Sequence, residues 1–135
     1  MPRTERDLWP SKRFATTVLA VRTDFLRAHP STVRALVAGG LDSTELIAKD
    51  PARAQQDVAD LIATVSGKPL KAAVIEVAWT KLEFTVDPVP ASLVTGAQYA
   101  FAVGVLRTKP SLDKLVDLTL LNDLLKERGK AEIAP

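Results

Sequence analysis

One uncharged, β-branched run near the start of the chain restricts the possible folds more than any other segment. The run is Phe14-Ala15-Thr16-Thr17-Val18-Leu19-Ala20-Val21, and it is apolar or β-branched at both alternations. A strand with one face in water alternates apolar and polar residues, whereas a run without that alternation is typical of a strand covered on both faces. The sequence therefore predicts a buried strand over residues 16–21, of the kind found inside a sheet flanked by helices.

Such a strand needs neighbours, because backbone N–H and C=O groups removed from water must be hydrogen-bonded. The rest of the chain offers few of them. Glu83-Phe84-Thr85-Val86 alternates like a short strand and stops at Asp87-Pro88, and Leu115-Val116 is shorter still. One buried strand with one short companion is not a stable sheet. We therefore expect the missing strands to come from another chain or from sequence that is absent here.

The remainder is predicted to be mainly helical, with prolines and glycines at the helix boundaries. Residues 1–15 are predicted to form an irregular leading segment. The predicted helices are residues 23–28 ended by His29-Pro30, a longer helix opened by Pro30 or Ser31, Pro51 to Gly67 with Asp50 as its cap, a helix beginning at Pro69-Leu70, Pro90 to about Leu106, and about Leu118 to Glu127. Gly39-Gly40 would cost about 1 kcal/mol per glycine relative to alanine, so we expect a kink or a closely packed neighbour there.

Composition excludes most catalytic and metal chemistry. The chain has 135 residues, enough for one domain with one core, and it has no cysteine. Disulfides, thiolate catalysis and cysteine-based metal sites are therefore excluded. Its one histidine, His29, rules out a two-histidine metal motif, and its position before Pro30 is typical of a loop or helix end. We expect no cofactor, no metal and no enzymatic activity.

Charge and hydropathy argue against a nucleic-acid partner, a membrane span and a secretory signal. The formal net charge is +2 and aromatic residues make up 5% of the chain, so a nucleic-acid surface is not expected. No apolar run approaches the ~18–20 residues that a membrane span needs. The charged start Met1-Pro2-Arg3-Thr4-Glu5-Arg6-Asp7 carries no secretory signal, so the chain as written is expected to stay in the cytoplasm.

Several short runs, taken in order, resemble the late part of one family of binding proteins. They are Glu5-Arg6-Asp7-Leu8-Trp9-Pro10, Arg13-Phe14-Ala15-Thr16-Thr17-Val18-Leu19, Val21-Arg22, Phe25-Leu26, His29-Pro30, Ala78-Trp79, Leu82-Glu83-Phe84-Thr85, Asp87-Pro88, Ser92-Leu93, Ala97, Ala100-Phe101, Gly104-Val105-Leu106 and Asp117-Leu118-Thr119-Leu120-Leu121-Asn122. The ordered set, rather than any single run, is similar to the solute-binding proteins of ABC importers for aliphatic sulfonates, nitrate and taurine. The chain departs from that family after Trp9-Pro10, where Ser11-Lys12 stands in place of a frequent glycine.

The resemblance implies an α/β, helix-rich fold that forms part of one lobe of the two-lobed periplasmic-binding-protein (type II) fold. Residues 1–135 would be a C-terminal segment of such a protein, with residues 16–21 as a crossover strand and residues 22–128 mainly helical. The implied function is capture of a small oxyanion, such as an aliphatic sulfonate, nitrate or taurine, for an ABC permease. An N-terminal lobe or another copy of the chain would complete the fold. The implied location is the periplasm or, for a lipoprotein, the cell envelope.

The first candidate ligand-binding residues are Thr16 and Thr17. The resemblance places their strand near the cleft between the lobes, where hydroxyl and backbone N–H groups would donate to a sulfonate or similar oxyanion. From the residues alone, the favoured interpretation is that both threonines are ordinary β-branched strand formers. Both interpretations stay open at this point.

Trp79, Phe84 and Thr85 are candidates for an apolar wall of the same cleft. Trp79 is also explained by core packing, because the inner face of its predicted helix already carries apolar residues. Phe84 and Thr85 alternate on a short predicted strand, so only one of them is expected to face a cleft. Lys81 is expected to pair with a surface carboxylate rather than to bind an anion.

Two other functions were weighed against ligand capture. Pyrimidine-precursor synthases of thiamine biosynthesis share the fold, but they need a histidine- and cysteine-bearing site that this chain cannot supply. The other alternative is a truncated or remnant helical protein without ligand binding, which would act at most as an interaction module.

Overall fold

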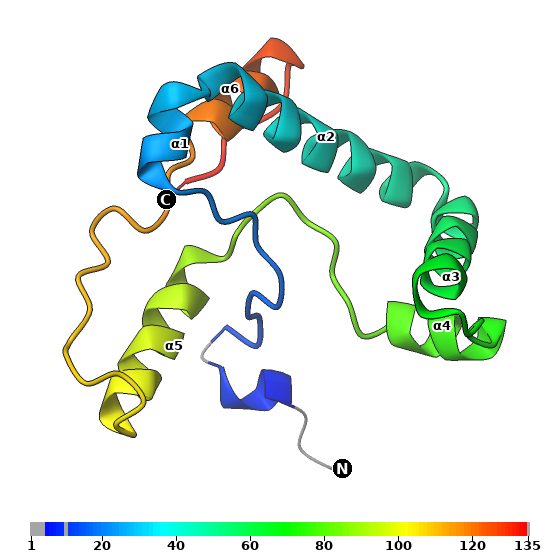
Figure 1. Cartoon of the computed structure of the whole chain (residues 1–135), viewed down its shortest axis with the longest axis horizontal. Coiled ribbons are helices and arrows are strands. Elements are labelled where there is room, and N and C mark those ends of the chain that lie inside the picture. Colours follow the sequence, from blue (N-terminus) through cyan, green and yellow to red (C-terminus); the bar gives the residue numbers. More distant parts are fainter. Residues whose placement is uncertain (1–4, 10, 135) are drawn as a thin grey trace. The chain divides into compact units, whose positions relative to one another are not determined.

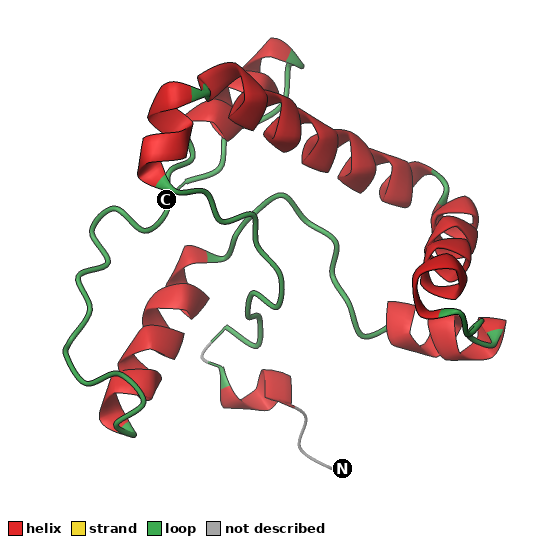
Figure 2. Ribbon diagram, in the orientation of Figure 1, coloured by secondary structure: helices red, strands yellow, loops and turns green. Residues whose placement is uncertain are grey.

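The computed structural model describes residues 5–9 and 11–134 (Figure 1). Within this part of the chain every regular element is helical, and no β-strand occurs (Figure 2). The elements are η1 (Glu5–Leu8, a 3-10 helix), α1 (Thr23–Ala28), α2 (Pro30–Lys49), α3 (Pro51–Ser66), α4 (Ala72–Trp79), α5 (Pro90–Ala102) and α6 (Thr119–Glu127). The expectation of a helix-rich chain is confirmed.

The chain divides into two units rather than forming the single core expected from its length. The first unit comprises the described residues up to Val37 together with those from Asp87 onward, and the second is Ala38–Val86. The boundary falls inside α2. Each unit buries only a few apolar side chains, which is too little for the single core that the composition allows.

In the first unit, α6 packs against the start of α2. Val33 of α2 and Leu124 and Leu125 of α6 are buried. Beside them, the Arg34 guanidinium of α2 forms an ion pair with the Glu127 carboxylate of α6. Leu124 and Leu125 therefore lie on the face that α6 buries.

Side-chain hydrogen bonds hold the start of α6 and join the helix to the segment that follows it. Asp117 Oδ1 accepts from the Thr119 backbone N–H at 2.9 Å, where the helix begins. Asn122 bonds the Ile133 backbone in both directions, donating from Nδ2 to the carbonyl at 3.0 Å and accepting from the N–H at Oδ1 at 2.9 Å. The hydrogen bonds from Thr119 hold the pKa of Asp117 below its ordinary value of 3.8.

The second unit is built from the rest of α2 with α3 and α4. Leu41 of α2, Ala54 of α3 and Ile75 of α4 are buried, and α3 packs against α4. All three are apolar residues on the helix faces that the unit turns inward. Most of the other large apolar side chains of this unit remain partly in water.

The limits of α3 are those that the sequence predicts. Asp50 Oδ1 accepts from the Arg53 backbone N–H at 3.1 Å, and Pro51 occupies the first turn. Gly67 ends the helix with φ +69°, the left-handed conformation that favours glycine. Asp50 is therefore a structural cap, as predicted.

Other helix limits agree in part. α1 has its predicted bounds, and α2 begins at Pro30, one of its two predicted starts. α5 ends at Ala102 rather than near Leu106, because Gly104 adopts φ +77° and breaks the helical path. α4 begins at Ala72, after the predicted Pro69-Leu70 start.

The predicted strands are absent from the described chain, and this corrects the sequence analysis. Residues 16–21, 83–86 and 115–116 all lie outside regular structure. The physical reason is that a strand persists only when a neighbour takes its backbone hydrogen bonds. Within the described chain, the backbone of residues 16–21 makes no such hydrogen bond, and residues 83–86 and 115–116 form no strand pairing.

Gly39 and Gly40 lie inside a continuous α2, and neither has a close neighbour. A Cβ built on either glycine meets nothing within 4 Å, so the predicted tight contact is wrong. The hydroxyls of Ser43 and Thr44 donate back to the carbonyls of Gly39 and Gly40 at 2.8 and 2.9 Å. These local bonds satisfy carbonyls that glycine leaves open to water.

Replacing both glycines should stabilise the chain. We expect Gly39→Ala and Gly40→Ala to raise the free energy of unfolding by about 1 kcal/mol each, since alanine restricts the unfolded chain and meets no atom in the helix. Urea unfolding followed by far-ultraviolet circular dichroism measures the change. The matched control is Gly67→Ala, which should lower stability by about 1 kcal/mol because its left-handed φ disfavours a side chain. A loss of stability in the double alanine variant would contradict this prediction.

The hydrogen bonds to Asp117 predict acid sensitivity of α6. A carboxyl whose pKa is lowered on folding stabilises the fold above its unfolded pKa, and that stabilisation is lost as the pH falls through the folded pKa. We therefore expect α6 to loosen below the ordinary value of 3.8. Asp117→Asn keeps the acceptor but cannot titrate, so its helix content should change less between pH 7 and strongly acidic solution. Equal acid sensitivity of both proteins would refute the assignment to Asp117.

Candidate functional site

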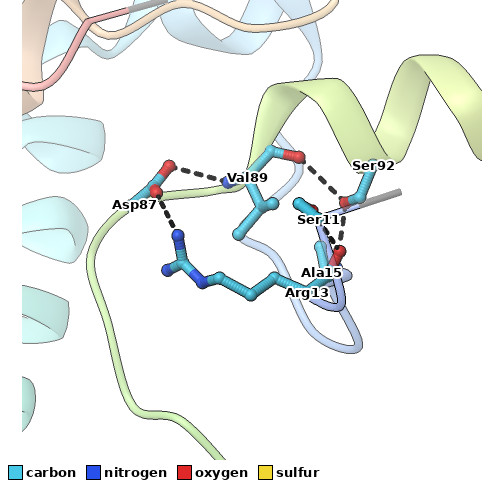
Figure 3. Close-up of polar contacts among 6 residues, drawn as sticks. All are labelled: Ser11, Arg13, Ala15, Asp87, Val89 and Ser92. Atoms are coloured by element: carbon cyan, nitrogen blue, oxygen red, sulfur yellow. Dashed lines mark hydrogen bonds and ion pairs between the residues drawn. The ribbon is translucent and has the colours of Figure 1, made fainter. Parts of the chain in front are cut away.

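In the first unit, the segment before residue 16 is fastened to the start of α5 by a cluster of polar contacts, termed the clasp. It consists of residues from two parts of the chain that lie far apart in sequence (Figure 3). The members are Ser11, Arg13, Ala15, Asp87, Val89 and Ser92. Ala15 is the clasp residue directly before Thr16. The clasp therefore fixes the position of the backbone from which the candidate residues Thr16 and Thr17 follow.

Ser92 is the buried centre of the clasp, with 5% of its surface exposed. Its Oγ accepts from the Ala15 backbone N–H at 3.0 Å, and its hydroxyl donates to the Val89 carbonyl at 2.8 Å. The hydroxyl therefore uses both its acceptor and its donor capacity. A partly buried backbone N–H and a partly buried carbonyl both depend on it.

Asp87 links the clasp to a charged partner. Its Oδ1 accepts from the Val89 N–H at 2.8 Å, and its Oδ2 lies 3.4 Å from Arg13 Nη1. Both side chains of the ion pair are about one-third exposed, so the pair contributes at most about 1 kcal/mol. Its main effect is to orient the loop before α5.

An aromatic cluster packs beside the clasp. The Trp9 ring stacks on Phe14 with ring centroids 5.3 Å apart, and it lies 6.0 Å from the Tyr99 ring of α5. A Cβ at Gly96 would stand 3.4 Å from the Trp9 ring, so the missing side chain allows the indole to approach the helix. Aromatic pairs of this geometry contribute roughly 0.5–1.5 kcal/mol beyond their buried area.

Two residues of this region adopt a left-handed backbone. Lys12 has φ +53° and Val89 has φ +50°. The conformation costs a non-glycine residue on the order of 1–2 kcal/mol, and a β-branched residue such as valine rarely adopts it. The hydrogen bonds of the clasp and the aromatic contacts offset this strain. The local geometry is therefore specified by tertiary contacts.

Thr16 and Thr17 follow the clasp and are exposed, and neither hydroxyl has a hydrogen-bond partner within the described chain. The same holds for the backbone groups of residues 16–21, which make no hydrogen bond to any described residue. Val18 and Leu19 are 45% and 57% exposed. The sequence predicts this segment to be buried on both faces, but in the structure its side chains are exposed to solvent.

The other candidates lie in the second unit. The Trp79 and Phe84 rings contact each other, with centroids 4.5 Å apart and planes tilted by 40°. Trp79 is half-buried at the end of α4, while Phe84 and Thr85 are exposed in the loop that follows. Lys81 forms no ion pair with any residue described here, so its predicted surface pair is wrong.

Of the predicted site residues, Trp79 and Phe84 contact each other within the second unit, to which Thr85 also belongs. Thr16 and Thr17 belong to the first unit. Sequence reasoning missed the clasp, because its bonds join residues 74 and 77 positions apart. The one available sequence signal was the turn former Asp87-Pro88.

Other features of the described chain add no second site. A hollow of about 380 Å³ is lined by Ser111, Asp113, Lys114 and Leu115, none of which is a predicted ligand residue. Within the described residues, no group of histidine and acidic side chains is arranged to hold a metal ion. No helix described here has the length and apolar character to cross a membrane.

The chemistry available beside the clasp is hydrogen-bond donation. The free hydroxyls of Thr16 and Thr17 and the free N–H groups of residues 16–21 are neutral donors. Neutral donors held on a backbone bind the oxygens of small anions. The arrangement is suited to binding rather than to proton transfer.

Comparison with known proteins gives no match: no family model, no curated protein and no solved structure is similar to this chain. The resemblance in the ordered sequence runs therefore stays a prediction. The function is argued below from the residues and contacts described above.

The clasp can be tested through Ser92. Ser92→Ala should lower the free energy of unfolding by about 1–3 kcal/mol, because the Ala15 N–H and the Val89 carbonyl lose a buried partner. Hydrogen exchange measured by mass spectrometry should also become faster in residues 11–21. Ser43→Ala, which removes an exposed hydroxyl, is the matched control. Unchanged exchange in residues 11–21 of the Ser92 variant would show that the clasp does not hold this segment.

Proposed function

We propose that the chain is part of the substrate-binding component of an ABC importer and captures a small oxyanion such as an aliphatic sulfonate, nitrate or taurine. It would form part of one lobe of a two-lobed type II periplasmic-binding fold. It would act by binding alone and would deliver its ligand to an ABC permease from the periplasm or the cell envelope. The observation that carries this proposal is the open segment 16–21 with its unpaired backbone.

An uncharged β-branched segment with free backbone groups is expected to be stable only beside other strands. In the proposed fold, residues 16–21 would cross between lobes and take those hydrogen bonds from strands outside the described chain. Exposed Val18 and Leu19 would then become buried. The proposal accounts both for the sequence pattern of a doubly covered strand and for the exposure of that strand here.

The donors at the start of the segment suit an oxyanion. Thr16 and Thr17 each offer a hydroxyl without a partner, and the clasp fixes the preceding residue through the Ala15 N–H. A fixed donor loses little conformational entropy when a ligand binds. A sulfonate or nitrate presents several oxygens that accept from such donors.

The backbone at Lys12 also supports the resemblance. The family often has a glycine after its Trp-Pro pair, and Lys12 adopts the left-handed φ of +53° that glycine favours. The departure at Ser11-Lys12 therefore changes the residue type without removing the turn. The Lys12 N–H still closes this turn on the Trp9 carbonyl at 2.9 Å.

A second candidate function is an interaction module without ligand binding. It is favoured by apolar side chains on the second unit, where Val65 of α3 and Val77 of α4 are 79% and 63% exposed. An interaction module would use such surfaces to bind another polypeptide. Ligand binding is the property that distinguishes the two functions.

Titration calorimetry with methanesulfonate, taurine and nitrate tests the proposal. The chain alone should show no measurable binding, because the strands that complete the cleft are absent. Binding should appear when a complementary N-terminal lobe of a sulfonate-binding protein is added. Micromolar binding by the chain alone would refute the requirement for a second lobe, and no binding after addition of a lobe would favour the interaction module.

The threonine hydroxyls supply the matched variants for that titration. In the completed protein, Thr17→Val should weaken sulfonate binding by about tenfold, because one hydrogen bond to a charged ligand is lost. Thr108→Val removes an exposed hydroxyl from a loop of the same unit and should leave the affinity unchanged. Equal affinities of the two variants would exclude Thr17 from the binding site.

A further inference from the structure

We propose that residues 16–21 also form an edge through which two copies of this chain pair as antiparallel strands. The inference rests on the proposed function only in treating this segment as a strand that is completed from outside the chain. It adds the identity of one partner, which is a second copy. The interaction surface is the backbone of the segment together with exposed Val18, Leu19 and Val21.

The free groups of the segment define what can bind there. Residues 17–22 run without helix or turn, and the backbone of residues 16–21 has no hydrogen bond to a described residue. A row of unpaired N–H and C=O groups is a template for another strand, because only an extended backbone presents the complementary groups at the same spacing. The partner is therefore an extended polypeptide segment.

One end of the segment is anchored, which favours pairing. The Ala15 N–H is held by Ser92. At the other end Arg22 has an extended backbone (φ −66°, ψ 139°) directly before α1, and its bonds to Asp24 at 2.7 and 3.0 Å are local and exposed. A segment held at one end has less conformational entropy to lose when it is incorporated in a sheet than a free one.

The sequence of the segment favours its own copy as the partner. Edges that must not self-associate usually carry lysine, proline, an inward charge or a bulge. Thr16-Thr17-Val18-Leu19-Ala20-Val21 contains no charged residue, no proline and no glycine. A short uncharged segment of high β-propensity pairs readily with an identical one, and nothing in this segment opposes that pairing.

The exposed surface is large enough for such an interface. The chain exposes 10414 Å². Two separately compact units of these sizes would expose roughly 8,300 Å² together, which leaves an excess of roughly 2,000 Å². That excess is greater than the roughly 800 Å² that each partner buries in a standard interface. The excess is spread over the whole chain, and Val18, Leu19 and Val21 are the large apolar side chains that contribute to it on the segment.

A two-fold axis through the middle of the segment would relate the copies. Antiparallel strands related in this way place a central residue, Val18 or Leu19, opposite itself, with Thr17 near the other copy's Leu19 or Val21. Apolar and β-branched residues then face one another on both faces of the ribbon. Such cross-strand pairs are the stabilising unit of a sheet.

Sedimentation velocity of the full chain over a wide concentration range, with infrared spectra of the same samples, tests the inference. We expect a monomer–dimer equilibrium in which the amide band of β-structure grows with the dimer fraction. Leu19→Lys should raise the dimer dissociation constant at least about tenfold, because it places a charge on the edge. Leu36→Lys is the matched control, since Leu36 is 52% exposed on α2 in the first unit, and it should leave the constant unchanged.

Thr17→Pro provides a second variant, because it removes one N–H from the edge without adding charge, and it should also weaken the dimer. A monomer at all concentrations would overturn the inference, as would a dimer without added β-structure or one weakened by Leu36→Lys alone. A monomer that binds methanesulfonate once a complementary lobe is added would overturn this inference and leave the proposed function standing. A strand-paired dimer that shows no sulfonate binding after the lobe is added would support this inference and overturn the proposed function.

Discussion

The unpaired backbone of residues 16–21 is the constraint on which the rest of this structure depends. Each residue of a buried strand brings an N–H and a C=O that must be hydrogen-bonded, and the described chain supplies no partner for them. With no sheet to pack against, the helices bury little, and no large side chain in the described part of the chain is fully enclosed. In the first unit, the absence of a strand and the small core go together.

The clasp explains why the segment begins at a defined place although it is not paired. Its hydrogen bonds and the Trp9 stack hold Lys12 and Val89 in left-handed conformations that those residues disfavour. Local strain of this kind persists only where surrounding contacts specify the geometry. In the proposed fold, the benefit of that strain is a fixed starting point for the crossover strand and for the donors of Thr16 and Thr17.

The sequence predicted the helices well and the site poorly. The helix limits depend on contacts within one turn, whereas the site depends on contacts between residues far apart in the chain. Asp50, Pro51 and Gly67 determine the limits of α3 through bonds to residues within one turn, so the limits follow from local residue types. Ser92 acts through Ala15, which lies 77 positions away, and no local pattern indicates that contact. The strand at residues 16–21 was mispredicted for a related reason, since its pattern reports burial whereas its formation depends on a partner.

The same distinction applies to α4. Its sequence, Ala-Ala-Val-Ile-Glu-Val-Ala-Trp, is apolar on nearly every side, which is typical of a helix surrounded by other elements. Within the second unit only Ile75 is buried, and Val74 and Val77 are 51% and 63% exposed. Periodicity identifies which faces are apolar, but the number of covered faces depends on how many elements are present to cover them. Residues 16–21 and α4 lie in different units, and their apolar residues follow different patterns, one typical of a strand and the other of a helix. Both have more apolar surface than their own unit covers. In the proposed fold, further polypeptide would cover both segments.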